Sequence, residues 1–348
     1  MRFTLPAKLS FPALAKRLAL LFALALVLAV CVQSLPAYAA TSLTNQISGN
    51  FKYTAYPDTL TAIITGYTGS GETEVTIPAN FGVYRVAGVS GSPFRSTGIK
   101  KLYLPDNLTT AVNVDDTTDR YCSADSETAR HVGTFISQNN TNYKIKILSN
   151  KTIQIVSYLG GASSLSIPSK IDGVNVTAIG NSVASGNTSI TSLTIPGTVT
   201  SIYAQAFYKC SNLSSVSLPQ SVTYIDSSAF AQTALTQVTL PEKLTYLPAS
   251  AFDSSVTRIC HAGTDTAALG SVGNFVSPSE PDYVIDENGG VLTIVKYNGK
   301  ASALSIPSTI DGVNVTSIRS QAVASNTSIT SLTVPGTVTS IYSQAFYK

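Results

Sequence analysis

Two histidines lie near two of the cysteines, the pairing that a thiolate nucleophile with an imidazole base requires. His261 directly follows Cys260, and His131 follows Cys122 in the same short segment. Catalysis by such a pair needs a thiol that is deprotonated in an electropositive, partly open environment. Cys122 and Cys260 instead occupy matching places in two similar segments, which favours equivalent small core residues of a repeated unit. We therefore expect no catalytic residue.

The motifs of other enzyme and cofactor classes are missing from the sequence. It has no G-x-S-x-G nucleophile elbow, no H-E-x-x-H zinc motif, no P-loop and no dinucleotide-binding fingerprint. It also has no C-x-x-C pair of the kind that binds zinc. These absences predict a protein that is not an enzyme and holds no cofactor.

One acidic group has the residue types that calcium prefers: Asp115, Asp116, Asp119, Asp125 and Glu127. Calcium binds carboxylate and carbonyl oxygens, but the spacing here is not that of an EF-hand loop. A solvated acidic loop is the ordinary explanation of such a group, and we expect no metal site.

The spacing of three Ile-Pro or Leu-Pro steps reveals an internal repeat. Pro196, Pro219 and Pro241 lie 23 and 22 residues apart. On a larger scale, residues 165–209 align without a gap with residues 304–348 and are identical at most positions. One full unit has the following pattern: Leu213-x-x-Val216-x-Leu218-Pro219-x-x-Val222-x-x-Ile225-x-x-x-Ala229-Phe230.

This unit has the pattern of one coil of a solenoid. The alternation of apolar and polar residues before each proline predicts a short strand with one face inward. Proline ends the strand because it has no N–H to donate to a neighbour. A unit of 22–23 residues cannot bury its apolar face alone, whereas stacked units bury a continuous core. We therefore predict a β-rich solenoid with short helical or 3-10 turns.

Two rows of outward positions are the candidates for ligand binding. The first row lies on the strands before the prolines and is uncharged: Thr194, Ser217 and Thr239. The second row occupies the position before the second inward aliphatic residue: Ser201, Tyr224 and Tyr246. Neighbouring coils are spaced like strands of a sheet, so we expect the two tyrosine rings to stack. For both rows a purely structural surface is the favoured alternative to ligand binding.

The repeat resembles the BspA-like, Treponema-type class of leucine-rich repeat, whose units are similar to LxxVxIPxxVxxIxxxAFxxC. The resemblance covers residues 165–258 and 304–348 well and residues 74–108 more weakly. Cys210 takes the small position before the next leucine. The resemblance implies an extracellular surface protein that mediates adhesion and partner binding without catalysis of its own.

The first 40 residues have the features of a secretory signal peptide. A basic leader precedes an unbroken apolar run of residues 18–30, and Ala37-Tyr38-Ala39 offers a cleavage site. The run is too short to span a bilayer, which needs about 20 apolar residues. This leader holds four of the 22 basic residues and none of the 19 acidic ones, so the mature chain is close to neutral. Such a charge argues against nucleic acid as a partner.

The remainder divides into three expected modules. They comprise residues 41–142, 143–280 and 281–348, and the first holds degenerate repeats. We expect each to begin with a β-hairpin, at residues 51–67, 143–158 and 283–297, the last turning around Asn288-Gly289. Residues 122–137 and 260–277 resemble each other and are expected to cap the first two modules, whereas the third stops within a repeat.

The sequence therefore predicts a secreted or bacterial-surface repeat protein that binds a protein or a glycan, with no membrane span in the mature chain. Adhesion through a protein ligand is the leading hypothesis. One alternative is a carbohydrate- or cell-wall-binding array. Another is the repeat spacer of a larger surface enzyme whose catalytic domain follows residue 348.

Export yields the first testable prediction. Because the apolar run is short and is followed by Ala37-Tyr38-Ala39, the mature protein is expected to begin at Ala40 or within two residues of it. N-terminal sequencing of secreted protein checks this. Recovery of an intact Met1 from the secreted material would show that the segment is not cleaved.

Overall fold

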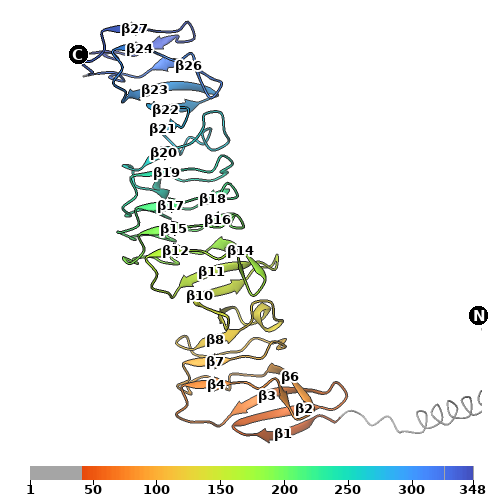
Figure 1. The fold of residues 1–348 in the computed structure, drawn as a ribbon. Helices are drawn as coiled ribbons and strands as arrows, with labels where there is room; N and C mark the ends of the chain where they lie inside the picture. The colour runs from red at the N-terminus through yellow and green to blue at the C-terminus, as the bar shows by residue number, and fades with distance from the viewer. Residues whose placement is uncertain (1–40, 325, 348) are drawn as a thin grey trace, which may run out of the picture.

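The protein is a β-rich stack of short strands. A computed structural model describes residues 41–324 and 326–347, so the signal helix expected within residues 1–40 lies outside the described residues. In the described part, 28 strands are joined by turns and by two short 3-10 helices, η1 (Thr128–Arg130) and η2 (Ala249–Ala251). Figure 1 shows the strands following one another along the length of an elongated molecule.

The strands before the Ile-Pro and Leu-Pro steps pair in parallel from one coil to the next. Leu193 lies beside Leu165 on one side and Val216 on the other, and the strand stops before Ile195-Pro196, as predicted. Two small sheets consist only of such strands. They are β12 (Ser164–Ser166), β15 (Ser192–Thr194) and β17 (Ser215–Ser217), and β24 (Ala303–Ser305) and β27 (Ser331–Thr333).

A second set of strands lies on another side of each coil. Ile202 of one coil pairs in parallel with Ile179 before it and Ile225 after it. These strands belong to a ten-stranded sheet. Its members are β4 (Glu74–Thr76), β7 (Lys101–Tyr103), β8 (Asp119–Cys122), β9 (Thr134–Ser137), β10 (Asn140–Ile147), β11 (Ile153–Tyr158), β13 (Lys170–Ile171), β14 (Val174–Ile179), β16 (Ser201–Ile202) and β18 (Tyr224–Ile225).

Three antiparallel hairpins interrupt the coils. Their outer pairs are Phe51 with Tyr67, Tyr143 with Tyr158 and Tyr283 with Tyr297, which are the limits expected from the sequence. The first hairpin lies in a five-stranded sheet of β1 (Leu43–Ser48), β2 (Phe51–Tyr56), β3 (Thr61–Tyr67), β5 (Asn80–Phe81) and β6 (Tyr84–Val89).

The third hairpin turns one residue later than predicted. Asn288 pairs with Val291, so Gly289 and Gly290 form the turn, and both have positive φ as a type I′ turn requires. This hairpin belongs to an eight-stranded sheet. Its strands are β19 (Gln237–Thr239), β20 (Thr257–Ile259), β21 (Phe275–Ser277), β22 (Glu280–Asn288), β23 (Val291–Tyr297), β25 (Thr309–Ile310), β26 (Val313–Ile318) and β28 (Ser340–Ile341).

The two segments expected to act as caps connect coils instead of closing them. In the first, β9 pairs in parallel with β8 and antiparallel with β10 of the next hairpin. In the second, β21 pairs with β20 and β22 in the same way. Each sheet therefore runs from the pre-proline strands of one module, through a hairpin, to the other side of the following coils. The strands β9 and β21 are thus each paired on both sides, so the sheet continues through them.

One continuous apolar core runs through the molecule, from Ala62 to Ala345. At its centre the phenylalanines of the Ala-Phe pairs stack coil on coil. The ring centroids of Phe207 and Phe230 are 5.4 Å apart, and those of Phe230 and Phe252 are 5.1 Å apart with nearly parallel planes. Burial of such a side chain contributes about 1.5–3 kcal/mol, so each coil depends on its neighbours for most of its stability.

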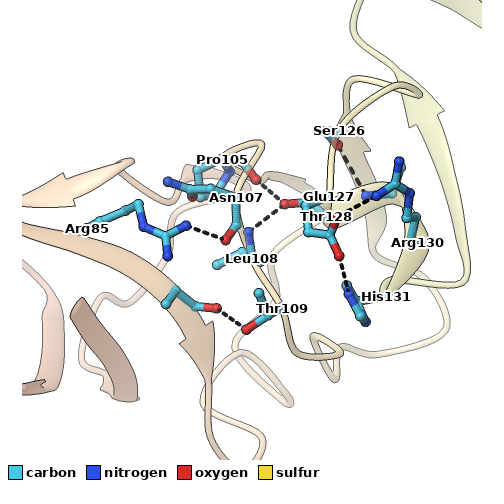
Figure 2. Close-up of polar contacts among 12 residues, drawn as sticks. Arg85, Pro105, Asn107, Leu108, Thr109, Ser126, Glu127, Thr128, Arg130 and His131 are labelled. Carbon is cyan, nitrogen blue, oxygen red and sulfur yellow. Dashed lines mark hydrogen bonds and ion pairs between the residues drawn. The ribbon is translucent and has the colours of Figure 1, made fainter. Parts of the chain in front are cut away.

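A buried threonine anchors each connecting segment to the preceding coil. The hydroxyl of Thr128 donates to the carbonyl of Pro105 and accepts the N–H of Leu108 at 2.9 Å (Figure 2). In the second segment, Thr266 makes the same two bonds with Pro241 and Leu244. Each threonine thereby satisfies two backbone groups that the turn after the proline leaves unpaired.

An aspartate in the next module secures the same segment from the other side. Asp172, in a tight turn with positive φ, accepts hydrogen bonds from the N–H of Ala124 at 2.7 Å, Ser137 Oγ at 2.8 Å and Asn139 Nδ2 at 2.8 Å. Burial acts to raise the pKa of the Asp172 carboxyl, but these hydrogen bonds outweigh it and lower the pKa below its ordinary value.

Asp311 repeats the contact at the second connecting segment. Its carboxylate accepts from the N–H of Ala262 at 2.8 Å, Ser277 Oγ at 2.6 Å and Ser279 Oγ at 2.7 Å. The side chain is only 12% exposed, and His261 Nδ1 lies 3.4 Å from it. The pKa of Asp311 is lowered as well, because these hydrogen bonds outweigh the effect of burial.

The two aspartates predict a pH-dependent stability. Because their folded pKa values lie below the unfolded value of about 3.9, their contribution is present above that pH and is lost as the pH falls toward the lowered pKa values. Replacing both by Asn is expected to cost about 1–3 kcal/mol per site at pH 7. It should also flatten the loss of stability between about pH 5 and pH 3, measured by urea unfolding.

The matched control is Asp116→Asn, since Asp116 is exposed and makes no hydrogen bond or ion pair in the described part of the chain. Its unfolding midpoint should follow that of the wild type at every pH. Equal pH profiles for the wild type and the double variant would contradict the assigned role of Asp172 and Asp311.

Candidate binding surface

The six predicted binding residues lie in two separate columns of the stack and on more than one sheet. Thr194 and Ser217 lie opposite each other on β15 and β17, with Thr239 on β19 of the next coil. Ser201 and Tyr224 pair on β16 and β18, and Tyr246 continues that column as an isolated bridge. Figure 1 shows β15 and β17 at one edge of the stack and β16 and β18 at the other. The structure therefore presents two candidate surfaces, not one site.

The tyrosine column is a stacked ladder, as predicted. The centroids of Tyr224 and Tyr246 are 4.8 Å apart and their planes differ by 12°. Tyr246 is 44% exposed, whereas Tyr224 is partly covered. The hydroxyl of Tyr224 donates to Asp226 Oδ2 at 3.2 Å, and this neighbouring carboxylate contributes, after desolvation, to raising the pKa of the phenol.

A third ring that sequence reasoning missed extends this ladder. Tyr203 follows the end of β16, and its ring centroid is 5.7 Å from that of Tyr224, with the two ring planes tilted by 50°. Tyr203 lies beyond the end of β16, so the strand pattern of the repeat gave no signal for this contact. Tyr203, Tyr224 and Tyr246 are called the tyrosine ladder below.

The Ser/Thr row is flat, exposed and uncharged. Thr194, Ser217 and Thr239 are all exposed, and none makes a side-chain hydrogen bond within the described residues. Beside them, Ser192 Oγ donates to Ser164 Oγ at 2.9 Å, so part of this face bonds to itself from coil to coil. The row offers hydroxyl groups but no aromatic ring and no concavity of its own.

The Cys–His pairs do not form a nucleophilic site. Cys122, Cys210 and Cys260 are free and buried. Burial raises the pKa of Cys122 and of Cys260 to about 12 and that of Cys210 to about 11. The imidazoles are engaged elsewhere, His131 with Glu127 at 3.0 Å and His261 with Asp311. A thiol with a raised pKa is a poor nucleophile.

The acidic group is largely neutralised by cations. Lys144 Nζ lies 2.7 Å from Asp119 Oδ1, Arg95 Nε lies 3.8 Å from Asp115 Oδ1, and Glu127 pairs with Arg130. Within residues 41–324 and 326–347, no group of His, Cys, Asp and Glu side chains is arranged to hold a metal ion. In the same range, no helix has the length and apolarity needed to cross a membrane.

Two half-buried arginines are further residues that the sequence analysis did not single out. Arg120 takes the inward position opposite Leu102, and Arg258 the one opposite Val238. Arg120 donates to the carbonyls of Thr134 and Val112, and Arg258 to those of Val272 and Ala249. They tie loops of the connecting segments together, which is a structural role.

The repeat matches a known family. The sequence profile described as "BspA type Leucine rich repeat region" matches in six copies, within residues 134–259 and 297–348. No curated protein matches the chain.

Three solved structures share repeats of this kind. A leucine-rich repeat protein from Bacteroides capillosus is 27% identical, over 34% of this chain and 94% of its own, with a TM-score of 0.30. The T. pallidum leucine-rich repeat protein is 18% identical over 57% and 83% of the two chains, with a TM-score of 0.30. A leucine-rich repeat protein from Bacteroides ovatus is 11% identical over 87% of this chain and 92% of its own, with a TM-score of 0.35. Family membership therefore rests on the repeat match.

The raised thiol pKa values predict low reactivity. With the pKa of Cys122 and Cys260 near 12 instead of 9.0, the thiolate fraction at pH 8 falls about a thousandfold. Native protein should therefore resist iodoacetamide, while protein unfolded in guanidinium should be alkylated at Cys122, Cys210 and Cys260. Mass spectrometry of the two samples checks this, and rapid native labelling of Cys122 or Cys260 would contradict it.

Proposed function

Because the chain belongs to the BspA-type leucine-rich-repeat family, we propose that it is a non-enzymatic, secreted or surface-exposed adhesion protein that binds a protein partner. The leader at residues 1–40 supports export. The buried thiols and the engaged histidines support a role in binding and not in catalysis.

The stacked coils serve as the platform in this proposal. We infer a solenoid whose coils repeat every 22–23 residues, arranged in three modules that each begin with a hairpin. The continuous core and the aspartate contacts at the connecting segments support a stiff array. A stiff array holds side chains of successive coils in fixed register, so a partner meets a pre-organised surface and little ordering entropy opposes binding.

The observation that carries the proposal is the tyrosine ladder. Tyr224 and Tyr246 cover each other's facing sides, so between these two rings a partner meets ring edges and phenol oxygens. The hydroxyls of Tyr203 and Tyr246 have no hydrogen-bond partner in the described part of the chain. Exposed tyrosines of this kind supply contact area at low conformational cost and add polar groups that orient a partner.

Ring geometry favours a protein over a sugar at this ladder. A pyranose stacks its C–H face on an open aromatic face, and the facing sides of Tyr224 and Tyr246 are occupied by each other. Peptide carbonyls and amides can reach the phenol hydroxyls from the side, as in other tyrosine-rich protein interfaces. Ser201, Thr194, Ser217 and Thr239 then belong to the surroundings of the interface or to a plain structural surface.

The double variant Tyr224→Ser/Tyr246→Ser tests the proposal, since serine already occupies the same position at residue 201. The mature chain is used to capture partners from a cell-surface protein fraction, and the affinity of each identified partner is then measured. Central interface tyrosines commonly dominate binding, so the affinity should fall at least about tenfold.

Tyr342→Ser is the matched control, because Tyr342 is exposed but stacks on no ring in the described residues. It should bind like the wild type. Unchanged affinity of the double variant together with a lower melting temperature would show that the ladder is scaffold only.

A further inference from the structure

A groove lies at the β4 end of the ten-stranded sheet, whereas Tyr224 of the tyrosine ladder lies on β18 at the other end. The groove offers a ligand different chemical groups from those of the ladder. It crosses the C-terminal ends of β4, β7, β8 and β9 and has a volume of about 720 Å³. Pro78 and Pro105 end the first two strands, so the chain turns away and leaves a trough over successive coils. Its walls carry an aromatic ring and several polar side chains: Thr76, Tyr103, Asp106, Asn107, Ser123, Gln138 and Asn139.

One wall is an aromatic ring with an open face. Tyr103 stacks on Tyr121 at 4.9 Å on the β8 side. On the other side its strand neighbour is Thr76, whose side chain is too short to cover the ring. Tyr103 therefore offers one face to a ligand. The electron-rich face of an aromatic ring attracts the weakly positive C–H groups of a sugar ring.

The other walls carry amide and hydroxyl groups with unused hydrogen-bonding capacity. Asn107 Oδ1 is buried in the wall and has no partner within the described residues. Asn139 uses its Nδ2 on Asp172, which leaves its Oδ1 free to accept and holds the side chain in place. Gln138 is exposed and adds a second amide. Amides both donate and accept, which suits the vicinal hydroxyls of a sugar.

The charge of the groove selects against anionic ligands. Asp106 is the one charged residue among those that line it. The nearby Arg85 is directed to the backbone carbonyl of Asn107, at 3.4 Å (Figure 2). No cationic group therefore lines the groove to bind a phosphate, sulfate or uronate.

The second connecting segment has the same backbone bonds but a different lining. Thr128 and Thr266 make equivalent contacts, so the two segments and the strands before them can be aligned residue by residue. In this alignment the residues that line the groove have the following counterparts: Thr239 for Tyr103, Lys243 for Asn107, His261 for Ser123 and Pro278 for Gln138. That segment thus lacks the aromatic ring and two of the polar groups. The features that favour a sugar are not required to build this part of the fold.

We propose that this groove binds a neutral oligosaccharide of equatorially substituted pyranose rings, with one ring stacked on Tyr103 and its hydroxyls bonded to Asn107, Gln138 and Asn139. Equatorial substitution leaves the ring C–H groups exposed on both faces, which stacking requires. The proposal does not depend on the tyrosine ladder, which lies on other coils.

The test measures binding of cellotetraose and chitotetraose to the mature chain by calorimetry and saturation-transfer NMR. At least one of them should bind, and Tyr103→Thr should weaken it at least tenfold. Tyr103→Phe should retain the affinity because it keeps the ring face. Asn107→Lys with Gln138→Pro, the residues of the second segment, should also weaken binding while leaving the melting temperature close to that of the wild type.

Two controls keep the outcome unambiguous. The variant Tyr224→Ser/Tyr246→Ser should bind the sugar like the wild type. Oligogalacturonate, which is anionic, should bind neither the wild type nor this variant, because no cationic group lines the groove. Failure of folded wild-type protein to bind either tetraose overturns the proposal. So does binding that is equally strong in Tyr103→Thr, since it would place the sugar elsewhere.

Discussion

The coils of this structure depend on parallel pairing between the short strands of successive repeats. A strand of two or three residues, such as β16 or β15, has too few hydrogen bonds and too little apolar surface to persist alone. Its backbone is satisfied only by the coils on each side, and Phe207, Phe230 and Phe252 are buried only because they cover one another. Charge has almost no part in this arrangement, which is why a sequence with 12% charged residues can form it.

Pairing alone would produce a uniform stack, and the hairpins make it a composite one. The second and third hairpins each receive a sheet from one side of the preceding coils and continue it on another side of the following coils. The change in direction leaves backbone groups that uniform coils would not have, and Thr128, Thr266, Asp172 and Asp311 satisfy them. The first module has an equivalent turn, between β5 and β6, but Gly82 stands there in place of an aspartate. No connecting segment precedes that turn in the described residues, so the carboxylate is present only at turns that contact such a segment.

The fixed register of the coils also explains why the tyrosine ladder and the groove at Tyr103 differ chemically. Positions that repeat at each coil form rows, and rows of rings necessarily cover each other's faces, as the tyrosine ladder shows. An open ring face arises only where a row ends or a neighbour is small, as at Tyr103 beside Thr76. Within one array, therefore, the interior of a row favours contacts through ring edges, and its end favours stacking on a ring face.

The local pattern of the sequence determined the coil, the ends of the strands before proline, the limits of the hairpins and the stacking of Tyr224 on Tyr246. Each of these follows from residue types within one repeat period. Contacts between distant coils were decided only by the tertiary structure. Asp172 reaches Ala124 and Asn139, Tyr203 joins the ladder, and Thr194 and Tyr224 lie on different sheets. The predicted caps proved to be bridges for the same reason. Periodicity specifies what a residue faces within its own coil, whereas the side chain it meets in another coil depends on how the hairpins redirect the sheets.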